Sequence, residues 1–171
     1  SLMVFETGDG QIGNTAVILA VYAALFLAYA LRFKQPLIGY LATASAALSV
    51  VYALNHFSLD LWLPALTGLA VAYYAIGFFL AHNESTKPWS AMSINSGLAL
   101  GAIVSIVALF TLKATGGWYA LVIAALFAIE MFTRRWAYFE VFVEALLNIG
   151  LIILLNDFKV HQLTYYFFGS S

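Results

Sequence analysis

The sequence contains no cysteine among its 171 residues. Disulfide bonds, thiolate metal sites and a cysteine nucleophile are therefore excluded. Charged residues are also scarce, because Lys, Arg, Asp and Glu together make up only 9% of the chain and the formal net charge is −1. Nucleic-acid phosphates are bound by clustered basic residues, so we expect no nucleic-acid partner.

Apolar residues are correspondingly abundant. They make up 64% of the chain, and the mean hydropathy is +0.94. Soluble globular proteins contain roughly 45–50% apolar residues. The excess predicts that the chain is surrounded by a lipid bilayer. Because a membrane-spanning helix needs about 20 mostly apolar residues, we expect an all-α, polytopic integral membrane helical bundle.

Short polar breaks divide the apolar sequence into six runs, which predict six transmembrane helices arranged as three hairpins in a single transmembrane domain over 1–171. The predicted spans cover residues 14–31, 36–55, 61–81, 89–112, 118–133 and 137–156. The first ten residues are expected to form a loop, and Lys113–Gly117 a turn. The last residues, from Tyr165, have the composition of the start of a seventh helix, so the fold is expected to be truncated there. The hairpins recur at similar spacing, either because short-loop hairpins do so or because a two-helix unit was duplicated.

Basic residues predict the orientation of the spans. Five of the seven fall at the turns after the first, third and fifth spans: Arg32, Lys34, Lys87, Arg134 and Arg135. Only Lys113 and Lys159 fall on the opposite side. Turns rich in Lys and Arg stay in the cytoplasm. We therefore expect an N-terminus outside and basic turns in the cytoplasm, in a plasma or inner membrane.

The strongest candidate site is a group of polar residues inside otherwise apolar sequence: Glu130, Arg134, Glu140, Glu144 and Asn148. Glu130 and Arg134 have the i, i+4 spacing of a helical ion pair. The other three also repeat every four residues, and we expect them to face the bundle interior because an ionisable group deep in lipid costs about 2.5–3.5 kcal/mol. A hairpin turning near Ala137 would bring Glu130 and Glu144 to one depth. Two hypotheses follow: an ion-pair network that fastens the hairpin, or a site where close carboxylates handle a proton or cation.

A second pattern predicts helix packing. Four small residues repeat every four positions in the fourth span: Ser93, Gly97, Gly101 and Ser105. Such a stripe lets another helix backbone approach closely. We expect a partner within the same chain, with the span 36–55 as the natural candidate, and a close backbone contact at Gly101.

The three histidines do not predict a metal site. His56 and His161 are each four residues from an aspartate, Asp60 and Asp157, but both pairs fall in predicted loops that would not hold the spacing of zinc ligands. His82 lies on the other side. We therefore predict no metal and no cofactor.

Three functions remain open. The leading hypothesis is a non-enzymatic, multi-pass membrane protein, either a small transporter-like or ligand-binding bundle or the membrane part of a larger protein. One alternative is an intramembrane enzyme that uses Glu130, Glu140 and Glu144 as acid–base groups. The other is a structural subunit that packs through small-residue faces, with a membrane-protein partner or a second copy of itself. The sequence identifies no catalytic residue.

Overall fold

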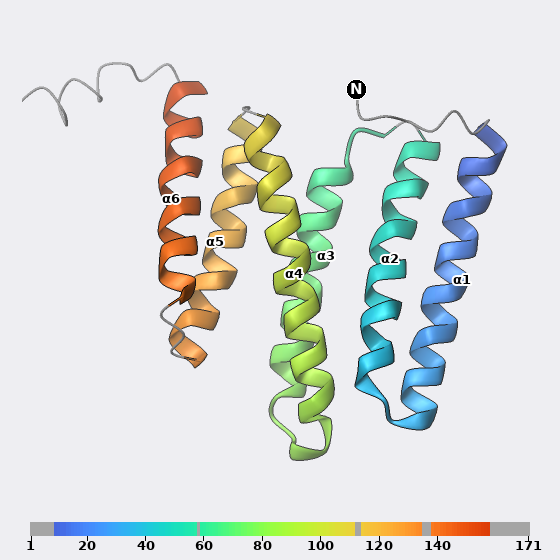
Figure 1. Ribbon diagram of the computed structural model, residues 1–171. Helices are drawn as coiled ribbons and strands as arrows, with labels where there is room; N and C mark the ends of the chain where they lie inside the picture. The colour runs from blue at the N-terminus through green and yellow to red at the C-terminus, as the bar shows by residue number, and fades with distance from the viewer. Residues whose placement is uncertain (1–8, 58, 112–113, 135–137, 158–171) are drawn as a thin grey trace, which may run out of the picture. The chain divides into compact units, whose positions relative to one another are not determined.

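The computed structural model describes residues 9–57, 59–111, 114–134 and 138–157 (Figure 1). In these ranges the regular structure is helical throughout, with no strand, which confirms the all-α prediction. The chain divides into two compact units, Ser1–Leu100 and Gly101–Ser171. The boundary falls inside one continuous helix, and the single transmembrane domain expected over 1–171 stays a prediction.

The helices follow the predicted spans closely. They are α1 (Asp9–Phe33), α2 (Pro36–His56), α3 (Trp62–Leu80), the short 3-10 helix η1 (Glu84–Thr86), α4 (Lys87–Thr111), α5 (Ala114–Arg134) and α6 (Tyr138–Asp157). The first helix begins earlier than predicted, because Asp9 and Gly10 belong to α1 rather than to a loop. An acidic residue is favourable in the first turn of a helix, where its charge opposes the positive end of the helix dipole.

Five helices in the described residues are long and apolar enough to cross a membrane. They are Ile12–Phe33, Pro36–His56, Trp62–Leu80, Glu84–Ala108 and Gly116–Arg134. The fraction of residues buried inside the protein is 11% in each of the first two spans and 56% in the fourth. Thus α1 and α2 present most of their apolar side chains outward, as expected for helices in contact with lipid, whereas α4 is largely surrounded by protein.

A two-residue turn joins α1 to α2. Lys34 adopts a left-handed backbone conformation, with φ of 54°. The amide of Lys34 donates to the carbonyl of Leu31 (3.4 Å), and that of Gln35 donates to the carbonyl of Ala30 (2.9 Å). These two bonds form the Schellman motif, which usually has glycine in place of Lys34. Pro36 then starts α2 at a position that needs no amide hydrogen.

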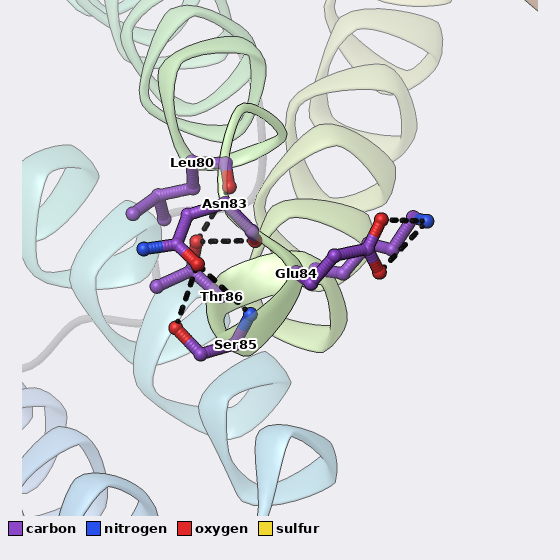
Figure 2. A network of polar contacts seen from close by, with 6 residues as sticks. Leu80, Asn83, Glu84, Ser85 and Thr86 are labelled. Atoms are coloured by element: carbon purple, nitrogen blue, oxygen red, sulfur yellow. Dashed lines mark hydrogen bonds and ion pairs between the residues drawn. The ribbon is translucent and has the colours of Figure 1, made fainter.

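The longer polar break between α3 and α4 is an ordered turn (Figure 2). The side chain of Asn83 accepts a hydrogen bond from the amide of Ser85 at 3.1 Å and so caps η1. The hydroxyl of Thr86 donates to the carbonyl of Leu80 at 2.6 Å, which ties the start of α4 to the end of α3. The turn therefore fixes where the α3–α4 hairpin reverses.

Within the first unit, α4 approaches α3 closely at two glycines. A Cβ atom added to Gly77 would lie 2.8 Å from the backbone nitrogen of Ile94, and one added to Gly97 would lie 2.7 Å from the carbonyl oxygen of Ala70. Both contacts are to backbone atoms, so any larger residue would push the helices apart. In lipid, such close van der Waals packing is a main source of helix association.

Helix α2 lies between α1 and α4 in the same unit (Figure 1). On the α4 side, Gly39 leaves room for the side chain of Met92. On the α1 side, the hydroxyl of Ser49 donates to the carbonyl of Ala16 at 2.8 Å. Small residues and hydroxyl groups therefore hold both interfaces of α2.

In the second unit, α5 and α6 form a hairpin around a pair of glycines. A Cβ atom on Gly117 would lie 2.8 Å from the side chain of Leu154 and 3.0 Å from the carbonyl of Gly150. The prediction that Lys113–Gly117 forms a turn is wrong for Ala114–Gly117, which are helical. Glycine normally weakens a helix, but here it lets the backbone of α6 approach, and that packing favours the helix.

Candidate functional site

Glu130 and Arg134 form an ion pair on α5, as their spacing predicts. The Nε atom of Arg134 pairs with Oε1 of Glu130. Glu130 is only 1% exposed, whereas the side chain of Arg134 is 34% exposed. A buried carboxylate is expensive unless it is paired. The long arginine side chain compensates that charge while it keeps access to the surface.

Aromatic side chains pack the α5–α6 hairpin one turn away from Glu130. Phe127 precedes Glu130 by three residues and therefore shares its face of α5. Its ring meets those of Phe139 and Phe142 on α6 edge to face, with centroids 5.4 Å and 4.7 Å apart. The face of α5 that carries Glu130 is thus packed here by apolar rings from α6.

The acidic stripe of α6, which we define as Glu140, Glu144 and Asn148, lies elsewhere. All three residues are exposed. The buried face of α6 is instead apolar and consists of Val143, Leu146, Gly150, Ile153 and Leu154. The prediction that the acidic stripe faces the bundle interior is therefore wrong. If Glu140 and Glu144 were also buried beside Glu130, Arg134 would be the one cation paired there to compensate three carboxylates. Burying the apolar face of α6 instead gains packing energy without that cost.

The small-residue stripe of α4, which we define as Ser93, Gly97, Gly101 and Ser105, meets α3 over its first half. The hydroxyl of Ser93 donates to the carbonyl of Tyr73 at 2.7 Å. A Cβ on Gly97 would lie 2.7–2.9 Å from backbone atoms of Ala70 and Tyr74. The close partner of this half is therefore α3 rather than the expected α2.

The second half of the same stripe lies in the second unit and faces α5. A Cβ on Gly101 would meet side-chain atoms only, the nearest being Cγ2 of Ile123 at 3.2 Å. The hydroxyl of Ser105 donates to the carbonyl of Gly101 in its own helix at 2.9 Å. The close backbone contact predicted at Gly101 is therefore found at Gly97. The stripe therefore contacts α3 in its first half and α5 in its second.

A polar network that the sequence did not reveal joins α2, α3 and α4. The hydroxyls of Thr43 and Ser96 lie 2.9 Å apart, and the hydroxyl of Tyr73 donates to the carbonyl of Thr43 at 3.1 Å. All three residues lie near the middle of their helices. In the sequence, Thr43 reads only as one of several small residues. The signal that could have found the network is the presence of three hydroxyl groups in mid-span positions.

One further polar contact lies at the edge of this network. The side-chain nitrogen of Asn95 on α4 donates to the hydroxyl of Tyr40 on α2 at 3.1 Å. Asn95 itself is exposed, whereas Ser93 and Ser96 on either side of it are buried. The contact therefore places an amide on the outer surface of the first unit.

Metal-ligating side chains do not gather among the residues that the structure describes, where no group of three or more His, Asp or Glu could hold an ion. His56 ends α2 and its ring lies against Gly13 of α1, while His82 is exposed in the α3–α4 turn. His161 lies outside the described residues. No protein-family model matches the chain, and no curated protein or solved structure matches it either.

Proposed function

We propose that the chain is a non-enzymatic, multi-pass membrane protein that acts as the membrane part of a larger assembly. One observation carries the proposal: all three residues of the acidic stripe of α6 are exposed rather than packed in the second unit. Its neighbours on that surface are apolar, as Val141 and Ile152 illustrate with 72% and 64% exposure. Polar groups on an apolar outer surface indicate that another protein covers them.

The depth of the acidic stripe supports this argument. Asn148 follows the start of α6 by ten residues, or about 15 Å at 1.5 Å per residue. Helix α6 is not among the five helices that meet the length and hydropathy criteria for a span; taken as the predicted sixth span, it would place Asn148 near the middle of a hydrocarbon core about 30 Å thick. Ionisable and amide side chains at such depth pair with one another or with a partner. The expected partner is a membrane-embedded segment that offers a basic side chain or hydrogen-bond donors to Glu144 and Asn148.

The enzymatic alternative has less support. It requires Glu130, Glu140 and Glu144 to act together, but Glu130 is buried while the other two are exposed. General acid–base catalysis needs its groups within hydrogen-bonding reach of one reacting centre. Glu130 is instead engaged with Arg134.

A transporter-like or ligand-binding function is the second candidate, and the polar network of Thr43, Tyr73 and Ser96 favours it. Transporters place their substrate sites near the middle of the membrane, and these residues lie near the middle of three helices. Thermal stability measured against a panel of small polar solutes would test this function. A ligand that stabilises the wild type but not Thr43→Val would support it.

We also propose the orientation that the basic residues predict, with the N-terminus outside and the basic turns in the cytoplasm. Ser85 and Asp60 are both exposed, in the α3–α4 and α2–α3 turns. Because the chain has no cysteine, Ser85→Cys and Asp60→Cys each create a unique label site. In intact cells an impermeant reagent should label the cysteine at 60 and not the one at 85, and the reverse result would invert the orientation.

The assembly proposal is tested by replacing the polar part of the acidic stripe. In Glu144→Leu/Asn148→Leu, the helix gains apolar surface, so the purified protein should unfold no more easily than the wild type. Native electrophoresis of gently solubilised membranes should show the wild type in a larger complex and the double variant without it. Leu151→Ala, on the same exposed surface, should leave the complex intact. A complex of unchanged size in the double variant would refute the proposal.

A further inference from the structure

The exposed amide of Asn95 has hydrogen-bonding capacity that the described residues do not use. A side-chain amide carries two N–H donors and an oxygen with two acceptor positions. Among the described residues, its one recorded hydrogen bond is the donation from Nδ2 to the hydroxyl of Tyr40. Since that hydroxyl accepts, its own hydrogen stays available to donate. Asn95 and Tyr40 therefore present both donors and acceptors at one point on the surface.

The surroundings of this point are apolar. Ala91 and Ala99, one turn before and one turn after Asn95 on α4, are both exposed. Leu41 of α2 is also exposed, at 53%. Asn95 follows the start of α4 by eight residues, or about 12 Å, and lies within the span Glu84–Ala108. In the hydrocarbon core of a membrane there is no water to satisfy the remaining groups.

We propose that a second copy of this chain docks on this surface, with the Asn95 amides of the two copies hydrogen-bonded to each other across a two-fold axis. Such an axis places each residue opposite its own counterpart or close to it. An amide is both donor and acceptor, so it is its own hydrogen-bonding complement. The exposed alanines on either side of Asn95 permit two α4 helices to approach closely.

The same symmetry argument separates this surface from the acidic stripe of α6. Two copies meeting through Glu144 would place like charges together, which costs free energy. That stripe therefore suits a different partner, whereas the Asn95 surface suits an identical one. The dimer proposed here does not depend on the assembly proposed above, since the two surfaces lie on different helices.

Energy transfer between labelled copies in liposomes tests the proposal. The chain lacks cysteine, so a dye on Ser85→Cys, in the exposed turn before α4, reports association of the full-length protein. We expect transfer that rises with the protein-to-lipid ratio, as a monomer–dimer equilibrium requires. Asn95→Leu should weaken the dimer about tenfold, in line with the measured strength of hydrogen bonds between membrane helices. Asn95→Gln, which keeps the amide, should retain most of the association.

Tyr40→Phe distinguishes a role of Asn95 in the dimer from a role of Asn95 in stabilising its own chain. It removes the hydrogen bond within the chain but leaves the amide of Asn95, so the dimer should persist. Glu144→Leu/Asn148→Leu should likewise leave self-association unchanged. The proposal is overturned if the wild type stays monomeric at every protein-to-lipid ratio, or if Asn95→Leu associates like the wild type. It is also overturned if Tyr40→Phe weakens the dimer as much as Asn95→Leu does.

Discussion

The contact between α3 and α4 at Gly97 gives a sharp test of the packing, through the change Gly97→Ala. The change adds one methyl group to a helix position where a Cβ atom would lie 2.7 Å from the carbonyl oxygen of Ala70 and 2.9 Å from the backbone nitrogen of Tyr74. The first distance is about 0.7 Å shorter than the 3.4 Å at which ordinary van der Waals contact begins. Because both neighbours are backbone atoms, no side chain can rotate away, and the two helices must separate.

Gly68→Ala on α3 is the matched control. A Cβ atom there would meet nothing within 4 Å, so only the intrinsic gain from replacing a helical glycine remains, about 0.5–1 kcal/mol. Gly97→Ala has the same intrinsic gain, so the difference between the two variants isolates the cost of overpacking, about 1–3 kcal/mol. We expect Gly68→Ala to be neutral or stabilising, and Gly97→Ala to be less stable than Gly68→Ala by that amount.

The measurement is reversible unfolding in mixed detergent micelles, followed by far-ultraviolet circular dichroism. Gly101→Ala adds a third comparison, because its Cβ would meet the side chain of Ile123 at 3.2 Å, and a side chain can move by a few tenths of an ångström. Its stability should fall between the other two. If Gly97→Ala and Gly68→Ala differ by less than about 0.5 kcal/mol, the usual scatter of neutral substitutions, the close α3–α4 contact is refuted.

Two other predictions concern single residues. Lys34→Gly should raise the thermal midpoint of unfolding, because it relieves a left-handed conformation that costs a non-glycine residue about 1–2 kcal/mol. Lys34→Ala keeps that cost and should not raise the midpoint. Equal midpoints for the two variants would argue against the Schellman turn. Arg134→Gln should lower the free energy of unfolding more than Glu130→Gln does, because it leaves a buried carboxylate without its cation. Such a loss reaches about 3–5 kcal/mol for fully buried pairs. It should be smaller here because Arg134 is partly exposed. The same detergent titration measures both variants, and the opposite order would show that Glu130 does not depend on Arg134.

The sequence predicted the helices well because their signal is local. An apolar run of about 20 residues with polar breaks is enough to predict a helix, and each predicted span corresponds to one observed helix. Five of these helices are long and apolar enough to cross a membrane, and α6 is not among them. The predictions that failed concern positions whose structure depends on packing against another helix. Gly116 and Gly117 read as a turn by composition, but α6 packs on Gly117 and keeps it helical. No property of Gly116 and Gly117 themselves reveals that α6 will pack against this part of α5.

The candidate site shows the same division between local and tertiary information. The pair of Glu130 and Arg134 follows from spacing along one helix and is present. The direction of the acidic stripe does not follow from α6 alone, because it depends on which face of α6 gains more from contact with α5. Likewise the stripe containing Gly97 indicates that some helix approaches α4, but its four residues fit α2, α3 or α5 equally well. The network of Thr43, Tyr73 and Ser96 needs three helices to exist at all.

A membrane protein has two ways to accommodate a polar side chain, and the described residues use both. Inside the chain, a hydroxyl group can donate to a backbone carbonyl, as Ser93 does to Tyr73, so burial costs little. A carboxylate has no such local donor, and Glu130 is buried only beside Arg134. Polar groups for which the chain supplies neither solution must lie outside, where lipid does not satisfy them. Asn95 and the acidic stripe are exposed, and for this reason we propose them as docking surfaces. A self-complementary amide suits a second copy, whereas carboxylates suit a different partner.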